Sequence, residues 1–200
     1  TKQASVEFYQ SPYIEYVIAI FMFLSGINFT LLLLMFNGKI KKFIHDAELK
    51  FYFVCVSFFT LFIAVCLYQT SPMGAEEAFR KSFFQVVSLQ TSTGFATADY
   101  MLWGCLLIPM IIGACAGSTT GGIKCIRMVI LFKIVKNEFK HILHPNAVLP
   151  VRVNKQVIPP TIQSTVLAFT FLYATIAFIS ILVMMGLGVG FLEAVGTVLS

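Results

Sequence analysis

Three stretches of this 200-residue chain carry no charged side chain, and they constrain its fold more than any other feature: residues 51–69, 101–123 and 157–192. A fourth stretch, residues 13–36, holds a single acid, Glu15. Crossing roughly 30 Å of hydrocarbon takes about 20 apolar residues, so each stretch is long enough to span a membrane. Charged residues make up 12% of the chain, against about 25% in soluble domains. These patterns predict an all-α membrane protein and exclude a water-surfaced globule.

Positive charge is concentrated on one predicted side of the membrane. Eleven of the 14 Lys and Arg residues fall in two segments, 39–50 and 124–155. Cytoplasmic loops of membrane proteins carry such an excess, so we expect both segments to face the cytoplasm. The net charge of +5 therefore reflects membrane topology and does not indicate nucleic-acid binding.

A short amphipathic segment separates the second and third apolar stretches. Residues 76–89, EEAFRKSFFQVVSL, predict a helix that is too short, and too polar at its start, to span a membrane. We expect this helix to dip into the membrane, because an ordinary outer loop would expose its Phe and Val side chains to water. The chain then returns through QTSTGFATADY. Such backbone occurs at membrane depth only where it is buried in protein or lines a wet cavity.

The Thr- and Gly-rich tip of this re-entrant loop predicts a cation site. Hydroxyl and carbonyl oxygens can replace the hydration shell of an ion without holding it too tightly. A glycine permits the positive φ that turns successive carbonyls toward one axis. Neutral oxygens of this kind suit a monovalent alkali ion. The predicted filter residues are Thr91, Ser92, Thr93, Gly94 and Phe95. The alternative is a polar outer turn that binds nothing.

The third apolar stretch is interrupted by GSTTGG at residues 117–122. A glycine in a helix interior costs about 1 kcal/mol relative to alanine. Three glycines in six residues therefore predict a break between two helical parts, 101–116 and 123–140. Flexible glycines and small hydroxyls could move between a blocking and an open arrangement at low cost.

The same segment has two further interpretations. A phosphate-binding loop is excluded because Ile123, and not Lys, follows Gly122. The GxxxG spacings of Gly113, Gly117 and Gly121 can mark close helix packing, which leaves a non-conducting membrane scaffold as an alternative. The spans carry no paired acids and no nucleophile with a base, so we expect no enzyme. The His and Cys residues form no ligand set, so we expect no bound metal beyond a permeant cation.

The strings QTSTGFATADY and CAGSTTGGIK resemble the third repeat of the Trk/Ktr/HKT superfamily of potassium transporters, and most of all the bacterial Trk-type uptake subunit. That superfamily repeats a unit of helix, pore loop and helix around one pore, with a broken inner helix. The resemblance implies an internal piece of a longer chain, divided into the last helix of the second repeat (1–38), a cytoplasmic basic loop (39–50), the complete third repeat (51–140), a cytoplasmic hairpin linker (141–160) and a truncated start of the fourth repeat (161–200).

The same resemblance implies a function. It implies potassium uptake across the bacterial cytoplasmic membrane, with K+ as the permeant ion, no cofactor, and Gly94 as the filter glycine. A sodium-permeable or sodium-coupled member of the same superfamily remains the alternative. The resemblance also implies an intramembrane gating loop beneath the filter, made of Gly117, Ser118, Thr119, Thr120, Gly121 and Gly122.

The basic residues have two interpretations. Lys124 and Arg127 follow the loop and either repel cations at the inner mouth or anchor the helix at the interface. The resemblance implies a homodimer and a cytosolic nucleotide-binding regulatory subunit. Candidate contacts for that subunit are the basic residues of the inner face, Lys133, Lys136, Lys140, Arg152 and Lys155.

Overall fold

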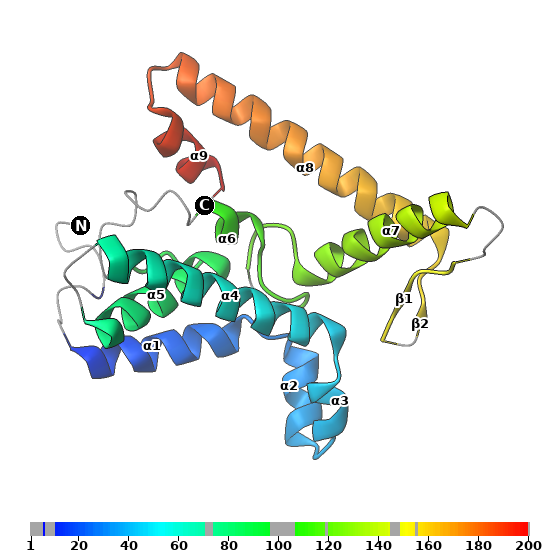
Figure 1. The fold of residues 1–200 in the computed structure, drawn as a ribbon, viewed down its shortest axis with the longest axis horizontal. Coiled ribbons are helices and arrows are strands. Elements are labelled where there is room, and N and C mark those ends of the chain that lie inside the picture. The colour runs from blue at the N-terminus through cyan, green and yellow to red at the C-terminus, as the bar shows by residue number, and fades with distance from the viewer. Residues whose placement is uncertain are drawn as a thin grey trace.

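The computed structural model describes residues 6, 11–70, 74–96, 107–118, 120–144, 149–154 and 156–199. The regular structure of these residues is almost entirely helical, and Figure 1 shows how the helices are arranged. The elements in chain order are α1 (Pro12–Ser25), α2 (Phe29–Phe36), α3 (Ile40–Ile44), α4 (Ala47–Thr70), α5 (Ala75–Gln90), α6 (Leu107–Ile111), α7 (Cys125–Leu143), β1 (Arg152–Val153), β2 (Gln156–Val157), α8 (Pro160–Gly186) and α9 (Phe191–Leu199).

Two of the described helices, α4 and α8, are long and apolar enough to cross a membrane. Both leave large apolar side chains exposed along their length, such as Phe58 on α4 and Phe171 on α8. Contiguous apolar surface of this kind suits contact with hydrocarbon or with other membrane helices. The predicted fold class, an all-α membrane protein, is confirmed.

The first apolar stretch does not form the single span that its composition predicts. α1 ends before Gly26, α2 begins after Asn28, and the two helices are bent by 99° relative to each other. Asn28 favours the break because its side chain accepts the Thr30 N–H at 2.9 Å and so caps α2. Tyr52 of α4 packs so closely on Gly26 that a Cβ there would overlap the phenol oxygen.

Helix α4 begins earlier than the sequence predicts, because Asp46 caps it. Asp46 Oδ1 accepts the N–H groups of Glu48 at 2.9 Å and Leu49 at 3.1 Å. These are donors that a helix start leaves unpaired. The segment predicted as a basic loop, residues 39–50, therefore contains helix α3 and the first turn of α4.

Helix α5 is the predicted re-entrant helix and is one residue longer at each end than the sequence indicates. It packs against both α1 and α4 (Figure 1). Phe84, Val86 and Val87 are fully buried by these neighbours. The packing thus removes these three apolar side chains from water, whereas a surface loop would expose them.

The third apolar stretch is broken, as predicted, but its first helical part ends at Ile111 and not at residue 116. Ile112 pairs with Ile123 in an isolated parallel bridge. The Gly113 N–H donates to the Ile123 carbonyl at 3.0 Å, and the Ile123 N–H donates to the Ile111 carbonyl at 3.2 Å. These bonds satisfy backbone groups that a helix would otherwise pair, which membrane-buried backbone requires.

Strands β1 and β2 form the short hairpin predicted around residues 154 and 155. The paired residues are Arg152 with Val157 and Val153 with Gln156. At the turn, Asn154 has a φ of 50°. Its Nδ2 donates to Asp46 Oδ2 at 2.6 Å, and its Oδ1 accepts the Ala47 N–H at 2.9 Å. The hairpin tip is thus docked on the start of α4.

Replacing Asn154 with alanine is expected to loosen this contact by about 1–2 kcal/mol, because two hydrogen bonds are lost and each contributes roughly 0.5–1.5 kcal/mol. Hydrogen exchange of the Ala47 amide, measured in the complete protein, should become faster. Asn154→Gly is the matched variant, since it keeps the positive φ but removes the side chain. Exchange rates unchanged in both variants would contradict the docking role.

Helices α8 and α9 repeat the order of α4 and α5. α8 is a long apolar helix, the chain turns at Gly188 with a φ of 87°, and the short α9 folds back beside it (Figure 1). The order of a long apolar helix followed by a shorter helix therefore recurs along the chain.

Candidate functional site

The predicted filter segment begins where α5 ends. The Thr91 N–H and the Thr91 Oγ1 both donate to the Val87 carbonyl, at 2.9 Å and 2.7 Å. The Thr93 N–H donates to the Ser88 carbonyl at 3.0 Å, and the hydroxyls of Thr91 and Thr93 lie 2.7 Å apart. These bonds hold the start of the segment at the carboxyl end of α5, where the helix carries partial negative charge.

The rest of the segment is an exposed turn with two left-handed residues. Ser92 has a φ of 51° and Gly94 a φ of 77°. Glycine adopts this conformation readily, whereas other residues rarely do. Ser88 Oγ donates to the Phe95 carbonyl at 2.6 Å and ties the far end of the segment back to α5. Ser92, Thr93, Gly94 and Phe95 are exposed in this chain, so the turn lies at its surface.

The predicted gating loop is also a turn closed by hydroxyl groups. Gly117 and Gly122 have φ values of 78° and 71°. Ser118 Oγ donates to the Cys115 carbonyl at 2.5 Å and lies 2.9 Å from Thr120 Oγ1. Ser118 and Thr120 are both buried. The loop is therefore a packed structure with small polar side chains inside it.

Three segments far apart in the sequence meet at this place. A Cβ on Gly121 would lie 3.5 Å from Ser92 Oγ, so the loop lies directly against the filter segment. A Cβ on Gly26 would lie 3.0 Å from Thr91 Cγ2, which places the break between α1 and α2 beside the start of the filter segment. The structure thus brings the predicted filter and the predicted loop together.

Comparison with known proteins identifies the family of this chain. The sequence profile of the TrkH family, described as cation transport protein, matches residues 1–200. The chain belongs to the TrkH family. The Trk system potassium uptake proteins TrkH and TrkG of Escherichia coli K12 are each 34% identical to it, over 100% and 99% of the chain.

The fold comparison gives the same result. The crystal structure of the potassium transporter TrkH from Vibrio parahaemolyticus matches 96% of the chain with a TM-score of 0.87 at 29% identity. The chain spans 43% of the length of that structure and of Escherichia coli TrkH. It is a membrane protein of a transport family.

The two basic residues after the loop of this TrkH-family chain contact different elements. Lys124 Nζ donates to the Ser118 carbonyl at 3.0 Å and so binds the loop itself. The guanidinium of Arg127 lies 3.8 Å from the centre of the Phe169 ring of α8, a cation–π contact. Among the predicted site residues, Thr119 lies outside the part of the chain that the structure describes.

An ion-pair network of this family member, which the sequence alone did not predict, anchors the N-terminal half of α5. The guanidinium of Arg80 pairs with Glu15 of α1 and, at 3.1 Å, with Glu76. Arg80 and Glu15 are 9% and 5% exposed. Nearby, a hydrogen bond from Lys81 lowers the pKa of the exposed Glu77 carboxyl. The sequence does carry one signal of this network: Glu15 is a single acid inside an apolar stretch, and such a charge needs a partner.

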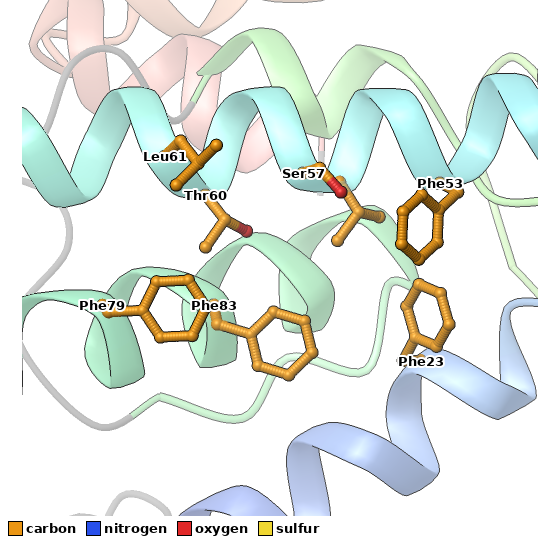
Figure 2. Close-up of a pocket in the computed structure, with 8 residues that line it drawn as sticks. Phe23, Phe53, Ser57, Thr60, Leu61, Phe79 and Phe83 are labelled. Carbon is orange, nitrogen blue, oxygen red and sulfur yellow. The ribbon is translucent and has the colours of Figure 1, made fainter. Parts of the chain in front are cut away.

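An apolar pocket of about 310 Å³ lies between α1, α4 and α5 in this TrkH-family chain. Figure 2 shows aromatic rings on all three helices around it, with the Ser57 and Thr60 hydroxyls as its polar groups. Two hydroxyls cannot replace the hydration shell of a cation. The described residues also include no group of three His, Cys, Asp or Glu side chains able to hold a metal ion. The filter segment is therefore the candidate ion site.

Proposed function

We propose that the complete protein takes up potassium across the bacterial cytoplasmic membrane, through a pore that this chain helps to enclose. One observation carries the proposal: the filter segment and the broken segment lie against each other, at Ser92 and Gly121. A row of neutral oxygens beside a movable turn is what a gated cation pathway requires. The similar TrkH and TrkG proteins are potassium uptake proteins. Permeation makes and breaks no covalent bond, so we propose no enzymatic step and no cofactor.

In this proposal, backbone and hydroxyl oxygens of residues 91–95 bind the dehydrated ion, and residues 117–122 form the gate. Residues 51–140 form one complete repeat of the pore. Residues 1–38 contain the last helix of the preceding repeat, and residues 161–200 form the start of the next repeat. Lys124 holds the gate through its bond to the Ser118 carbonyl.

The proposal includes a homodimer and a cytosolic nucleotide-binding regulatory subunit that binds the basic inner face. Exposed Lys136, Lys140 and Arg152 supply charge there. Lys133 Nζ donates to the Arg152 carbonyl at 2.6 Å, which joins α7 to the hairpin within this face. Lys155 lies outside the described residues.

Deleting residues 118–121 tests the gate. Basal flux of K+ and Na+ through the complete protein in liposomes should rise about tenfold. This rise corresponds to a loss of ~1.4 kcal/mol from the free energy that favours the closed gate. The amount of purified protein controls for folding. A deletion variant that is present in normal amounts but conducts no more than the wild type would refute the gate and favour close helix packing through GxxxG.

The flux ratio of the wild type separates the remaining alternatives. Preference for K+ supports the proposal, whereas equal or greater Na+ flux identifies a sodium-permeable member of the family. Absence of any flux from correctly folded protein identifies a non-conducting scaffold.

A further inference from the structure

A buried carboxylate lies where the intramembrane loop begins. Glu48 belongs to the first turn of α4 and is only 5% exposed. An acid is favourable near a helix N-terminus, but that effect operates equally well at the surface. A carboxylate buried inside a protein is costly unless it is paired or hydrogen-bonded. The burial of Glu48 therefore indicates that its oxygens have specific partners.

The Glu48 carboxylate binds the residue that precedes the loop. Its Oε1 accepts the Ala116 N–H at 2.5 Å. Asn28, at the break between α1 and α2, and Ile126, in the helix that follows the loop, lie close to the same carboxylate. One carboxylate thus binds the entrance of the loop at a place where three segments of the chain meet.

The break between α1 and α2 holds the same entrance directly. The Cys115 N–H donates to the Gly26 carbonyl at 3.0 Å. A Cβ on Gly117 would lie 3.1 Å from Asn28 Oδ1. Residues 115 and 116 are therefore held by groups that come from outside the broken helix itself. Movement of these two residues breaks both bonds, and a buried hydrogen-bonding group left without a partner costs about 1–3 kcal/mol.

We propose that Glu48 is a positioning residue that keeps the intramembrane loop closed. The Gly26 carbonyl, which binds Cys115, and Asn28, which lies beside Gly117, hold the same entrance of the loop. The proposal rests on the proposed function of the loop as a gate. Glu48 touches no filter residue in the described contacts. It sets how readily the loop moves and leaves ion selectivity to residues 91–95.

The experiment measures the loop and the ion flux separately. In a complete protein that keeps Cys115 as its single cysteine, labelling by a thiol reagent reports loop movement, because Cys115 is 0% exposed in this structure. Glu48→Ala should raise the labelling rate and the basal flux about tenfold, equivalent to ~1.4 kcal/mol. Glu48→Gln keeps an acceptor for Ala116 without the charge and should give a smaller rise. The K+/Na+ flux ratio should not change in either variant.

Glu193→Gln is the matched control, since Glu193 also lies in the first turn of a helix but is exposed. Wild-type labelling and flux in folded Glu48→Gln and Glu48→Ala protein would overturn the proposal. If Glu48→Ala does not fold, the labelling rate and basal flux of Glu48→Gln alone decide whether the proposal holds. Faster labelling in a protein that conducts no ions even as wild type would support the loop anchor and refute the proposed function.

Discussion

Replacing Gly94 with alanine should reduce potassium uptake by the complete protein about 5- to 30-fold, because a left-handed backbone costs a non-glycine residue roughly 1–2 kcal/mol. Gly94 has a φ of 77°, and among the described residues, its chain neighbours aside, no atom lies within 4 Å of the position of its missing Cβ. The expected effect therefore comes from the backbone conformation. Gly94→Asp should have a larger effect, since a carboxylate beside neutral oxygens binds a cation too tightly and relaxes the preference for K+. Ion uptake and the K+/Na+ flux ratio are the measurements.

Gly38 provides the matched control for this prediction. It has a φ of 74° and equally open surroundings, but it lies between α2 and α3 and away from the filter segment. Gly38→Ala should lose a similar amount of stability and keep its selectivity. A Gly94→Ala protein with wild-type uptake and wild-type flux ratio would refute the assignment of residues 91–95 as the filter.

Replacing Arg80 with leucine should destabilise the complete protein by about 3–5 kcal/mol, because it leaves a buried carboxylate without its partner. Arg80 joins α5 to Glu15 of α1 and also pairs with Glu76, whose Oε1 accepts the Tyr16 hydroxyl at 3.1 Å. Its loss therefore removes the polar link between the re-entrant helix and α1. The thermal midpoint of the purified protein and the yield from membranes are the measurements.

Two further variants make the Arg80 prediction specific. Lys81→Leu breaks the neighbouring pair with Glu77, which is more exposed, and exposed i,i+4 pairs contribute only about 0.3–0.5 kcal/mol. Combining Arg80→Leu with Glu15→Leu should recover much of the lost stability, since no buried charge then remains. An Arg80→Leu protein as stable as Lys81→Leu would contradict the buried network.

The elements that the sequence predicts well are those specified by local patterns. α5 lies within one residue of its predicted ends because its acidic start and apolar end can be read from residues 76–89 alone. Local patterns also predict α8, from a long uncharged apolar stretch, and the hairpin at Asn154, from alternating apolar and polar residues. The start of α4 was placed too late, because the cap formed by Asp46 depends on side-chain geometry and not on hydropathy.

The parts that the sequence analysis missed depend on contacts between distant segments. The helix before the loop ends at Ile111 because Ile123 pairs with Ile112, a partner that no local window reveals. The break at Gly26 was missed because an uncharged Asn28 barely lowers the hydropathy of its surroundings. Glu48 was read as part of a basic loop, since its burial arises only when residue 116 lies beside it.

The bond between Ser88 and the Phe95 carbonyl has a consequence for how ions would travel. A carbonyl that already accepts a hydroxyl proton offers less negative charge to anything else, so the Phe95 oxygen attracts a cation more weakly than it would without this bond. Under the proposed function, an ion is then coordinated loosely at Phe95. Ser88→Ala would remove the bond and strengthen the binding of an ion at the Phe95 carbonyl.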